Sequence, residues 1–125
     1  MTTVTERRNF YSLSAEQKQE FIDTIVESKR RGIYDKYVVW HAQTMSIMTK
    51  LVHEDNNRNA AHAGPIFLPW HRELLRRFEM DLQQINSNFS LPYWKWEDEH
   101  DLINAELWQW VGGNGDASER DRFSF

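Results

Sequence analysis

The stretch 61–72 constrains the fold more than any other part of this chain. It reads Ala-His-Ala-Gly-Pro-Ile-Phe-Leu-Pro-Trp-His-Arg, so that His62 and His71 lie nine residues apart. The Gly-Pro pair between them predicts a turn. Pro69 fits the first turn of a helix, where the missing N–H of proline costs nothing. We therefore expect a histidine in a loop and a second histidine at the beginning of a helix.

A first helix is predicted upstream, at about residues 14–31. Ser14-Ala15-Glu16-Gln17 is a capping-box pattern. Apolar residues then recur at helical spacing, and Gly32 is a natural stop. These apolar residues are Phe21, Ile22, Ile25 and Val26.

A second helix is predicted from Tyr34 or Asp35 to about 51–53. Its apolar positions recur every three or four residues, as in one buried stripe that contains a histidine. The stripe consists of Tyr34, Val38, His41, Met45, Met48 and Val52. On this pattern Met45 and Met48 are interpreted as core residues rather than as soft copper ligands.

Residues 54–66 are rich in asparagine and hold the Gly-Pro turn, so a loop is expected there. A third helix then begins near Pro69, with His71 in its first turn, and ends at 86–88. Its apolar stripe is Leu74, Phe78, Leu82 and Ile85.

The remaining segment holds many aromatic residues and no strand pattern of useful length. Residues 91–96 predict an extended piece packed over the helices, and 105–111 predict a short helix that ends at the following glycines. The expected fold is all-α, an antiparallel helical core that forms half of a four-helix bundle. We expect one domain over 1–125, with an N-terminal arm at 1–13, a helical core at 14–88 and an aromatic, Gly-rich segment at 89–125.

Composition excludes several classes of function. The formal net charge of -4 gives no general attraction to nucleic acid. The absence of cysteine excludes disulfides, thiolate ligands and a cysteine nucleophile. No stretch approaches the roughly 20 apolar residues of a membrane span. The polar beginning of the chain does not resemble a signal peptide, so a cytoplasmic protein is expected.

Three histidines, His41, His62 and His71, are candidate ligands of one metal ion. Singly, each is more often a core or surface residue. Together they predict a site between two antiparallel helices and a rigid loop, because metal sites are commonly built between facing helices. Imidazole suits copper, zinc, iron and nickel. Three ligands leave an open position, which favours catalysis over a structural role.

Two further histidines are interpreted as surface residues, since both His53 and His100 have acidic neighbours. His53-Glu54 suggests a zinc-protease motif. However, Asn57 stands where the second histidine of that motif belongs.

These motifs resemble the first copper-binding half of the tyrosinase family, the type-3 copper proteins that also include catechol oxidases and molluscan haemocyanins. The resemblance covers roughly residues 30–113. It rests on Tyr-Val-x-x-His at 37–41, Ala-His-x-Gly-Pro at 61–65, Phe-Leu-Pro-Trp-His-Arg at 67–72, Phe78-Glu79 and Leu-Pro-Tyr-Trp-x-Trp at 91–96.

The resemblance implies roles for particular residues. His41, His62 and His71 would bind the first copper, called CuA. Phe67 would pack against the loop histidine, and a buried pair between Arg72 and Glu79 is plausible. The three histidines of the family's second site, CuB, have no counterpart in this sequence.

This departure determines the expected function. Reducing O2 by two electrons takes two Cu(I) ions, and this chain offers ligands for one. We expect a homodimer with one copper ion per chain and a pair per dimer. It would act as a copper oxidoreductase that uses O2 on phenols or ortho-diphenols, without membrane or nucleic-acid partners. The alternatives are a partner chain that supplies CuB, or a mononuclear or non-catalytic copper protein. Monooxygenase, oxidase and O2 carrier remain open.

Overall fold

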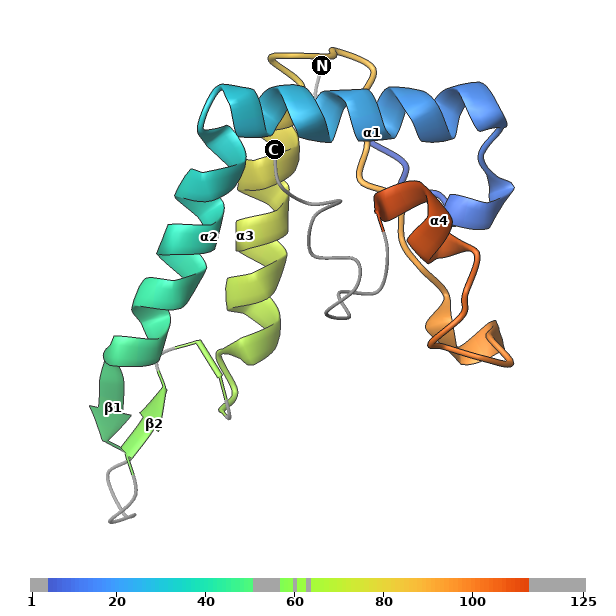
Figure 1. The fold of residues 1–125 in the computed structure, drawn as a ribbon. Helices are drawn as coiled ribbons and strands as arrows, with labels where there is room; N and C mark the ends of the chain where they lie inside the picture. The colour runs from blue at the N-terminus through green and yellow to red at the C-terminus, as the bar shows by residue number, and fades with distance from the viewer. Residues whose placement is uncertain (1–4, 51–56, 60, 63, 113–125) are drawn as a thin grey trace.

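Three helices form the body of the fold (Figure 1). The computed structural model describes residues 5–50, 57–59, 61–62 and 64–112. Helix α1 (Ala15–Arg30) lies across one end of an antiparallel pair, α2 (Ile33–Gln43) and α3 (Phe67–Leu82). A short helix, α4 (Leu107–Val111), lies beneath α1 on the other side of α3. The all-α fold predicted from the sequence is confirmed.

The short elements are 3-10 turns and one small hairpin. The turns are Phe10–Ser12, Thr44–Ser46 and Trp96–Asp98. Strands β1 (Met48–Lys50) and β2 (Asn57–Asn59) pair antiparallel at the far end of α2, with Thr49 opposite Arg58. The hairpin was not expected from the sequence, which suggested helix and then loop over these residues.

Helix α1 begins and ends as its sequence predicts. The Gln17 backbone N–H donates to Ser14 Oγ at 3.2 Å, and the Ser14 N–H donates to Gln17 Oε1 at 2.9 Å, which completes the capping box. Gly32 follows with φ +72°, in the left-handed region that favours glycine. This residue turns the chain from α1 directly into α2.

Helix α2 ends about eight residues earlier than the sequence suggested. Near its end, Thr44 Oγ1 donates to the His41 carbonyl at 2.7 Å, and Ser46 Oγ donates to the Gln43 carbonyl at 2.8 Å. Such side-chain bonds compete with the helical ladder, and here the helix tightens into a 3-10 turn. The prediction that α2 continues to 51–53 was wrong.

The predicted buried stripe on α2 was also wrong. Val38 is 52% exposed and Met45 is 59% exposed, so the interpretation of Met45 as core fails. The buried residue of α2 is Tyr37. Val52 lies outside the described residues.

Helix α3 holds Pro69 in its first turn, as expected, but it ends at Leu82 rather than near 86. Ile85 lies in the turn that follows, where its backbone N–H donates to the Leu82 carbonyl at 2.9 Å. The apolar stripe therefore continues past the helix. A tight turn keeps Ile85 close to the last helical turn.

An aromatic core joins the N-terminal arm to the segment after α3. Phe21 on α1 packs against Phe10 and Phe89, with ring centroids 6.0 Å apart in both cases. The Phe10 N–H donates to the Tyr93 carbonyl at 2.8 Å, and the Tyr93 N–H donates to the Arg8 carbonyl at 2.9 Å. Tyr93 therefore pairs with the N-terminal arm and holds it in place, whereas Trp96 begins the 3-10 turn that follows, so the predicted extended piece ends before Trp96.

Lys18 on α1 contacts both the N-terminal arm and the region of α4. It is only 8% exposed, and its Nζ lies 5.4 Å from the ring centroid of Phe10, 5.9 Å from Tyr11 and 5.3 Å from Trp110. The same atom pairs with Glu106 Oε1 at 3.6 Å. Aromatic faces attract a cation, so this lysine stabilises the packing of α4 against α1 and the N-terminal arm.

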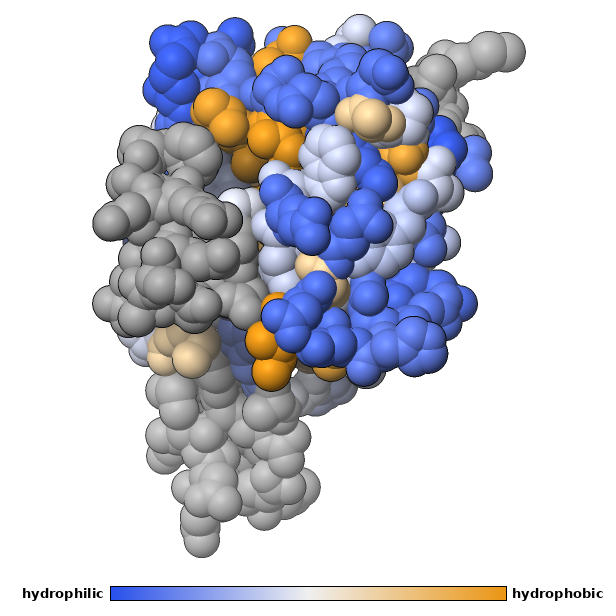
Figure 2. Space-filling model, turned by 45° about the vertical axis from the view of Figure 1, so that its right-hand side comes forward, coloured by the Kyte–Doolittle hydropathy of each residue, from blue (hydrophilic) through white to orange (hydrophobic). Residues whose placement is uncertain are grey.

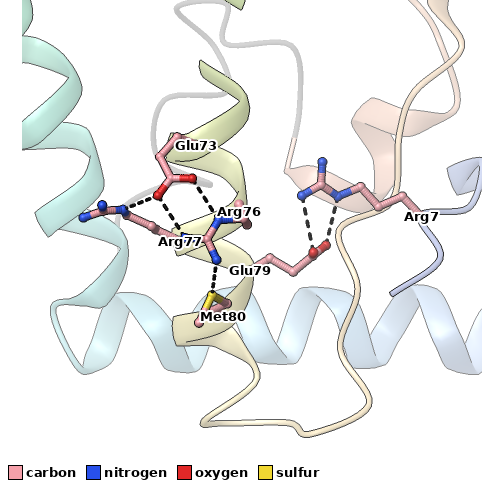
Figure 3. A network of polar contacts seen from close by, with 6 residues as sticks. All are labelled: Arg7, Glu73, Arg76, Arg77, Glu79 and Met80. Carbon is pink, nitrogen blue, oxygen red and sulfur yellow. Dashed lines mark hydrogen bonds and ion pairs between the residues drawn. The ribbon is translucent and has the colours of Figure 1, made fainter. Parts of the chain in front are cut away.

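Two carboxylates on α3 have different surroundings (Figure 3). Glu79 is 7% exposed and accepts from Arg7 Nε at 3.0 Å, Arg7 Nη2 at 3.3 Å and the Leu91 N–H at 2.8 Å. The ion-pair partner of this carboxylate is thus Arg7, from the N-terminal arm, and not Arg72 as the sequence suggested. Glu73, two turns nearer the beginning of α3, pairs on the surface with Arg76 and Arg77.

The described surface is mainly hydrophilic on the face shown in Figure 2, where apolar side chains occur in small separate groups. Among the described residues, no helix has the length and apolar character needed to cross a membrane.

Candidate metal centre

The three candidate histidines meet at the end of the α2–α3 pair that lies away from α1. His41 is in the last turn of α2, His62 is in a bend before α3, and His71 is in the second turn of α3. The Nε2 atoms of His41 and His62 are 3.1 Å apart, and those of His71 and His41 are 3.4 Å apart. One ligand atom from each lies within 4.8 Å of the others.

These separations fit a single metal ion. Imidazole nitrogens bind zinc at ~2.0–2.1 Å, so two nitrogens on a tetrahedral ion of this size lie about 3.3–3.4 Å apart. The three rings are inclined to one another by 68–82°, with centroids 4.9–5.5 Å apart. The donor set is all nitrogen, which suits copper and the other metals that prefer imidazole.

A backbone carbonyl fixes the orientation of His71. Its Nδ1 lies 2.8 Å from the carbonyl oxygen of Phe67, one helical turn earlier. A carbonyl oxygen only accepts, so Nδ1 carries the proton and donates it. Nε2 then keeps its lone pair for a metal ion, in the arrangement that commonly orients ligand histidines.

Aromatic rings enclose the histidines from two sides. The ring centroid of Phe67 lies 4.4 Å from His71 and 6.1 Å from His62, as expected for an aromatic residue packed against the loop histidine. Trp70 lies on the α2 side, 4.9 Å from His71 and 5.9 Å from His41. These rings limit how far the imidazoles can turn.

The surroundings of His62 favour its neutral form. Partial burial lowers the pKa of His62 below its usual 6.5, and nearby His41 and His71 lower it further, because a proton on one ring repels a proton on the others. A neutral ring is the form that binds metal. His62 therefore keeps its lone pair available to a lower pH than a free histidine would.

The other histidines lie elsewhere. His100 is exposed and follows Glu99, which accepts hydrogen bonds from Tyr11 and from Trp94 Nε1, the latter at 2.9 Å. His53 is outside the described residues. Within the described ranges, His41, His62 and His71 are the group of histidine and acidic side chains whose geometry could hold a metal ion.

Comparison with known proteins places the chain in a family. The family model for tyrosinase, described as the common central domain of tyrosinase, matches residues 31–124, which is well over half of the chain. The chain belongs to the tyrosinase family. The match spans all three histidines of the candidate site.

Curated relatives agree with this assignment. The chain is 40% identical to grixazone synthase of Streptomyces griseus over 116 residues, covering 91% of this chain and 37% of that protein. It is 38% identical to a tyrosinase of Streptomyces antibioticus over 114 residues, covering 90% of this chain and 40% of that protein. The chain thus spans about two fifths of the length of these tyrosinase-family relatives.

Sequence reasoning missed two elements of the centre, the Phe67 carbonyl and the Trp70 ring. The carbonyl was detectable in principle. Residues 67 and 71 are one helical turn apart, so a carbonyl at 67 faces a side chain at 71. The role of Trp70 was not detectable in the same way, because its contact with His41 joins two helices.

Proposed function

We propose that this chain supplies one copper site of a dinuclear oxidoreductase, which uses O2 to oxidise phenols or ortho-diphenols, and that a second copy of the chain supplies the other site. The observation that carries the proposal is the convergence of three histidine side chains, each with one ring nitrogen within 4.8 Å of the others, in a group that could hold a metal ion. Membership of the tyrosinase family supports copper as that ion. The names of the relatives support a phenolic substrate.

When bound, copper would act as a Lewis acid and as an electron relay for O2. The residues of the chain bind the ion, orient its ligands and shield them from water. His41, His62 and His71 would hold the ion, and the Phe67 carbonyl keeps the His71 lone pair directed at it. Trp70 and Phe67 keep water from the rings on the sides that they cover.

Exposed apolar side chains near the centre support a partner. On α2, Val38 lies one turn before His41 on the same helical face and is 52% exposed. Met45 lies in the 3-10 turn that follows α2, four residues after His41, and is 59% exposed. On α3, Leu68 and Leu75 have the same spacing around His71 and are 74% and 43% exposed. Apolar side chains thus flank the histidines on both helices.

We call Val38, Met45, Leu68 and Leu75 the flanking residues. A second copy would bury them and bring its own three histidines close to those of the first. Two-fold dimers are the commonest homo-oligomers, and a two-fold interface is self-complementary. Two α2–α3 pairs would then complete a four-helix bundle around two ions.

Copper content and solution mass, measured together on the full chain, test this proposal. We expect a dimer with two copper ions that gains a near-ultraviolet charge-transfer band when the reduced form meets O2. A monomer with one copper ion and no such band would instead indicate a mononuclear protein. A band that needs a different added chain would indicate a separate partner.

A surface variant tests dimer formation independently of copper binding. Leu68→Glu places a charge among the flanking residues, and we expect a monomer that still binds copper but loses the O2-dependent band. The matched control is Leu102→Glu, at a position that is 46% exposed and lies outside the α2–α3 pair. If Leu68→Glu remains dimeric, the proposed interface is wrong.

Ligand variants test the assignment of the site itself. His71→Ala should abolish copper binding, whereas His100→Ala should leave it unchanged. The reverse result would overturn the assignment. Copper affinity should also fall as the pH drops through the pKa of His62, which lies below the usual 6.5, because protonated imidazole does not bind metal.

A further inference from the structure

Three oxidisable side chains lead away from the candidate metal centre in unbroken contact. Trp70 packs on His71 with ring centroids 4.9 Å apart. Trp40 packs on Trp70 at 5.6 Å, and Tyr37 packs on Trp40 at 5.9 Å. The path alternates between α3 and α2 and then follows α2 toward α1. Tryptophan and tyrosine are, with cysteine and methionine, the side chains most readily oxidised by one electron.

The path ends at a phenol with a proton acceptor. Tyr37 is 8% exposed, and its hydroxyl donates to Asp81 Oδ2 at 2.7 Å. The Asp81 side chain is 36% exposed and also accepts from Lys36 Nζ at 2.6 Å. The phenol is therefore buried, while the carboxylate that faces it reaches water.

We infer that Trp70, Trp40 and Tyr37 form a hole-transfer path, which carries one-electron oxidising equivalents from the three-histidine centre to Tyr37. The inference rests on the proposed function for the source of the oxidant, a one-electron oxidant formed when copper at the centre meets hydrogen peroxide or O2 without substrate. One electron moves from Tyr37 through Trp40 and Trp70 to reduce that oxidant. The phenolic proton moves to the Asp81 carboxylate, which leaves a neutral tyrosyl radical.

The charges around the path favour Tyr37 as its end. Arg77 Cζ lies 5.7 Å from the ring centroid of Trp40, and this positive charge opposes a radical cation on the indole. Tyr37 avoids a positive charge by releasing its proton to Asp81. Lys36 Nζ is 4.7 Å from the Tyr37 ring, but its charge is paired with the same carboxylate.

The phenol is suited to coupled loss of a proton and an electron. Burial raises the pKa of Tyr37 well above its usual 10, and the hydrogen bond to Asp81 raises it further. The group is therefore a phenol and not a phenolate at neutral pH. Oxidation requires a nearby base, and the hydrogen bond provides one.

Such a path would protect the centre. The imidazoles that hold the ion are the nearest groups to an oxidant formed there, and their oxidation would destroy the site. A radical on Tyr37 lies two ring contacts beyond Trp70, where an external reductant can restore it through the exposed Asp81 side. Damage to His41 and His71 should therefore increase when the path is broken.

The test uses the full chain loaded with copper, with copper content measured first. Hydrogen peroxide is added without phenol, the sample is frozen, and electron paramagnetic resonance is recorded. We expect a tyrosyl signal that is lost in Tyr37→Phe, reduced at least several-fold in Trp40→Phe and kept in Tyr93→Phe. Trp108→Phe is the matched tryptophan control, because Trp108 packs on Trp94 and not on the path. A signal unchanged in Tyr37→Phe would overturn the inference.

A second measurement needs no metal and separates this inference from the proposed function. Azide radicals from pulse radiolysis oxidise tryptophan selectively, and the indolyl and phenoxyl radicals have distinct visible bands. In the metal-free chain we expect fast, concentration-independent conversion of indolyl to phenoxyl radical, which Tyr37→Phe largely removes. If copper does not bind but this conversion is seen, the proposed function fails and the path stands. If copper binds but both signals survive Tyr37→Phe, the path fails alone.

Discussion

Replacing Glu79 by glutamine should destabilise the fold far more than the same change at Glu73, although both residues lie on α3 and both pair with arginine (Figure 3). The Glu79 carboxylate is buried and accepts three hydrogen bonds, two from Arg7 and one from the Leu91 N–H. Glu79→Gln keeps the shape but removes the charge, and it turns an NH2 group toward a donor.

The magnitude follows from those contacts. A hydrogen bond to a charged group contributes ~1.5–3 kcal/mol to stability, and a broken buried pair costs more. The Arg7 side chain is 35% exposed, so solvent screens part of its interaction. We expect Glu79→Gln to lower the free energy of unfolding by about 2 kcal/mol. With an m-value of about 2 kcal/mol/M, the urea midpoint falls by about 1 M.

Urea unfolding followed by far-ultraviolet circular dichroism measures this loss, with Glu73→Gln as the control. Arg76 and Arg77 lower the pKa of Glu73 to about 2, but all three side chains are 39–57% exposed. Water screens that interaction, so Glu73→Gln should move the midpoint little.

A double-mutant cycle that combines Glu79→Gln with Arg7→Ala then isolates the interaction energy of the Arg7–Glu79 pair. Equal midpoints for the two glutamine variants, or no coupling between Arg7 and Glu79, would refute the reasoning.

Three further predictions concern single contacts. Gly32→Ala should cost about 1–2 kcal/mol in denaturant unfolding, because φ is +72° while the space around a Cβ is open; no loss would contradict the left-handed turn. Lys18→Met should lower thermal stability by about 1 kcal/mol, since it keeps the packing and removes the cation from three aromatic rings; an unchanged melting temperature would exclude that contribution. Hydrogen bonds from Lys36 and Tyr37 lower the pKa of Asp81 below 3.8, so its stabilisation is present above that pH and lost as pH falls through the lowered pKa. Asp81→Asn should weaken the loss of stability at acid pH, measured by urea unfolding as a function of pH. An unchanged pH dependence would show that a group other than Asp81 causes it.

Short-range features of the fold were predictable because their causes are local. The Ser14 capping box and the left-handed Gly32 depend on residues within one turn of each other, and both stand as predicted. The end of α2 was wrong because apolar periodicity alone suggested continuation. The hydroxyls of Thr44 and Ser46 donate to backbone carbonyls of the last turn and so compete with the helical hydrogen bonds. The spacing of apolar residues carries no information about that competition.

Long-range pairing was less predictable. The spacing on α3 suggested Arg72 as the partner of Glu79, but the structure supplies Arg7 from 72 residues away. Likewise the exposure of Met45 could not be read from its apolar spacing, because α2 ends at Gln43 and Met45 lies in the 3-10 turn that follows. An apolar residue on a helix face is buried only if another element covers that face.

By itself, the sequence predicted both ends of α1, the turn before α3 and three histidines as candidate ligands, since these follow from residue types at fixed short spacings. The resemblance of its motifs to the tyrosinase family was equally a property of the sequence, and the comparisons confirm it. Only the tertiary structure decided that the three histidines bring their ring nitrogens together, because His41 and His71 meet only when α2 and α3 pack antiparallel. It also decided that Trp70, Trp40 and Tyr37 form one continuous path. Ring contacts across two helices depend on how those helices are packed, which no local pattern specifies.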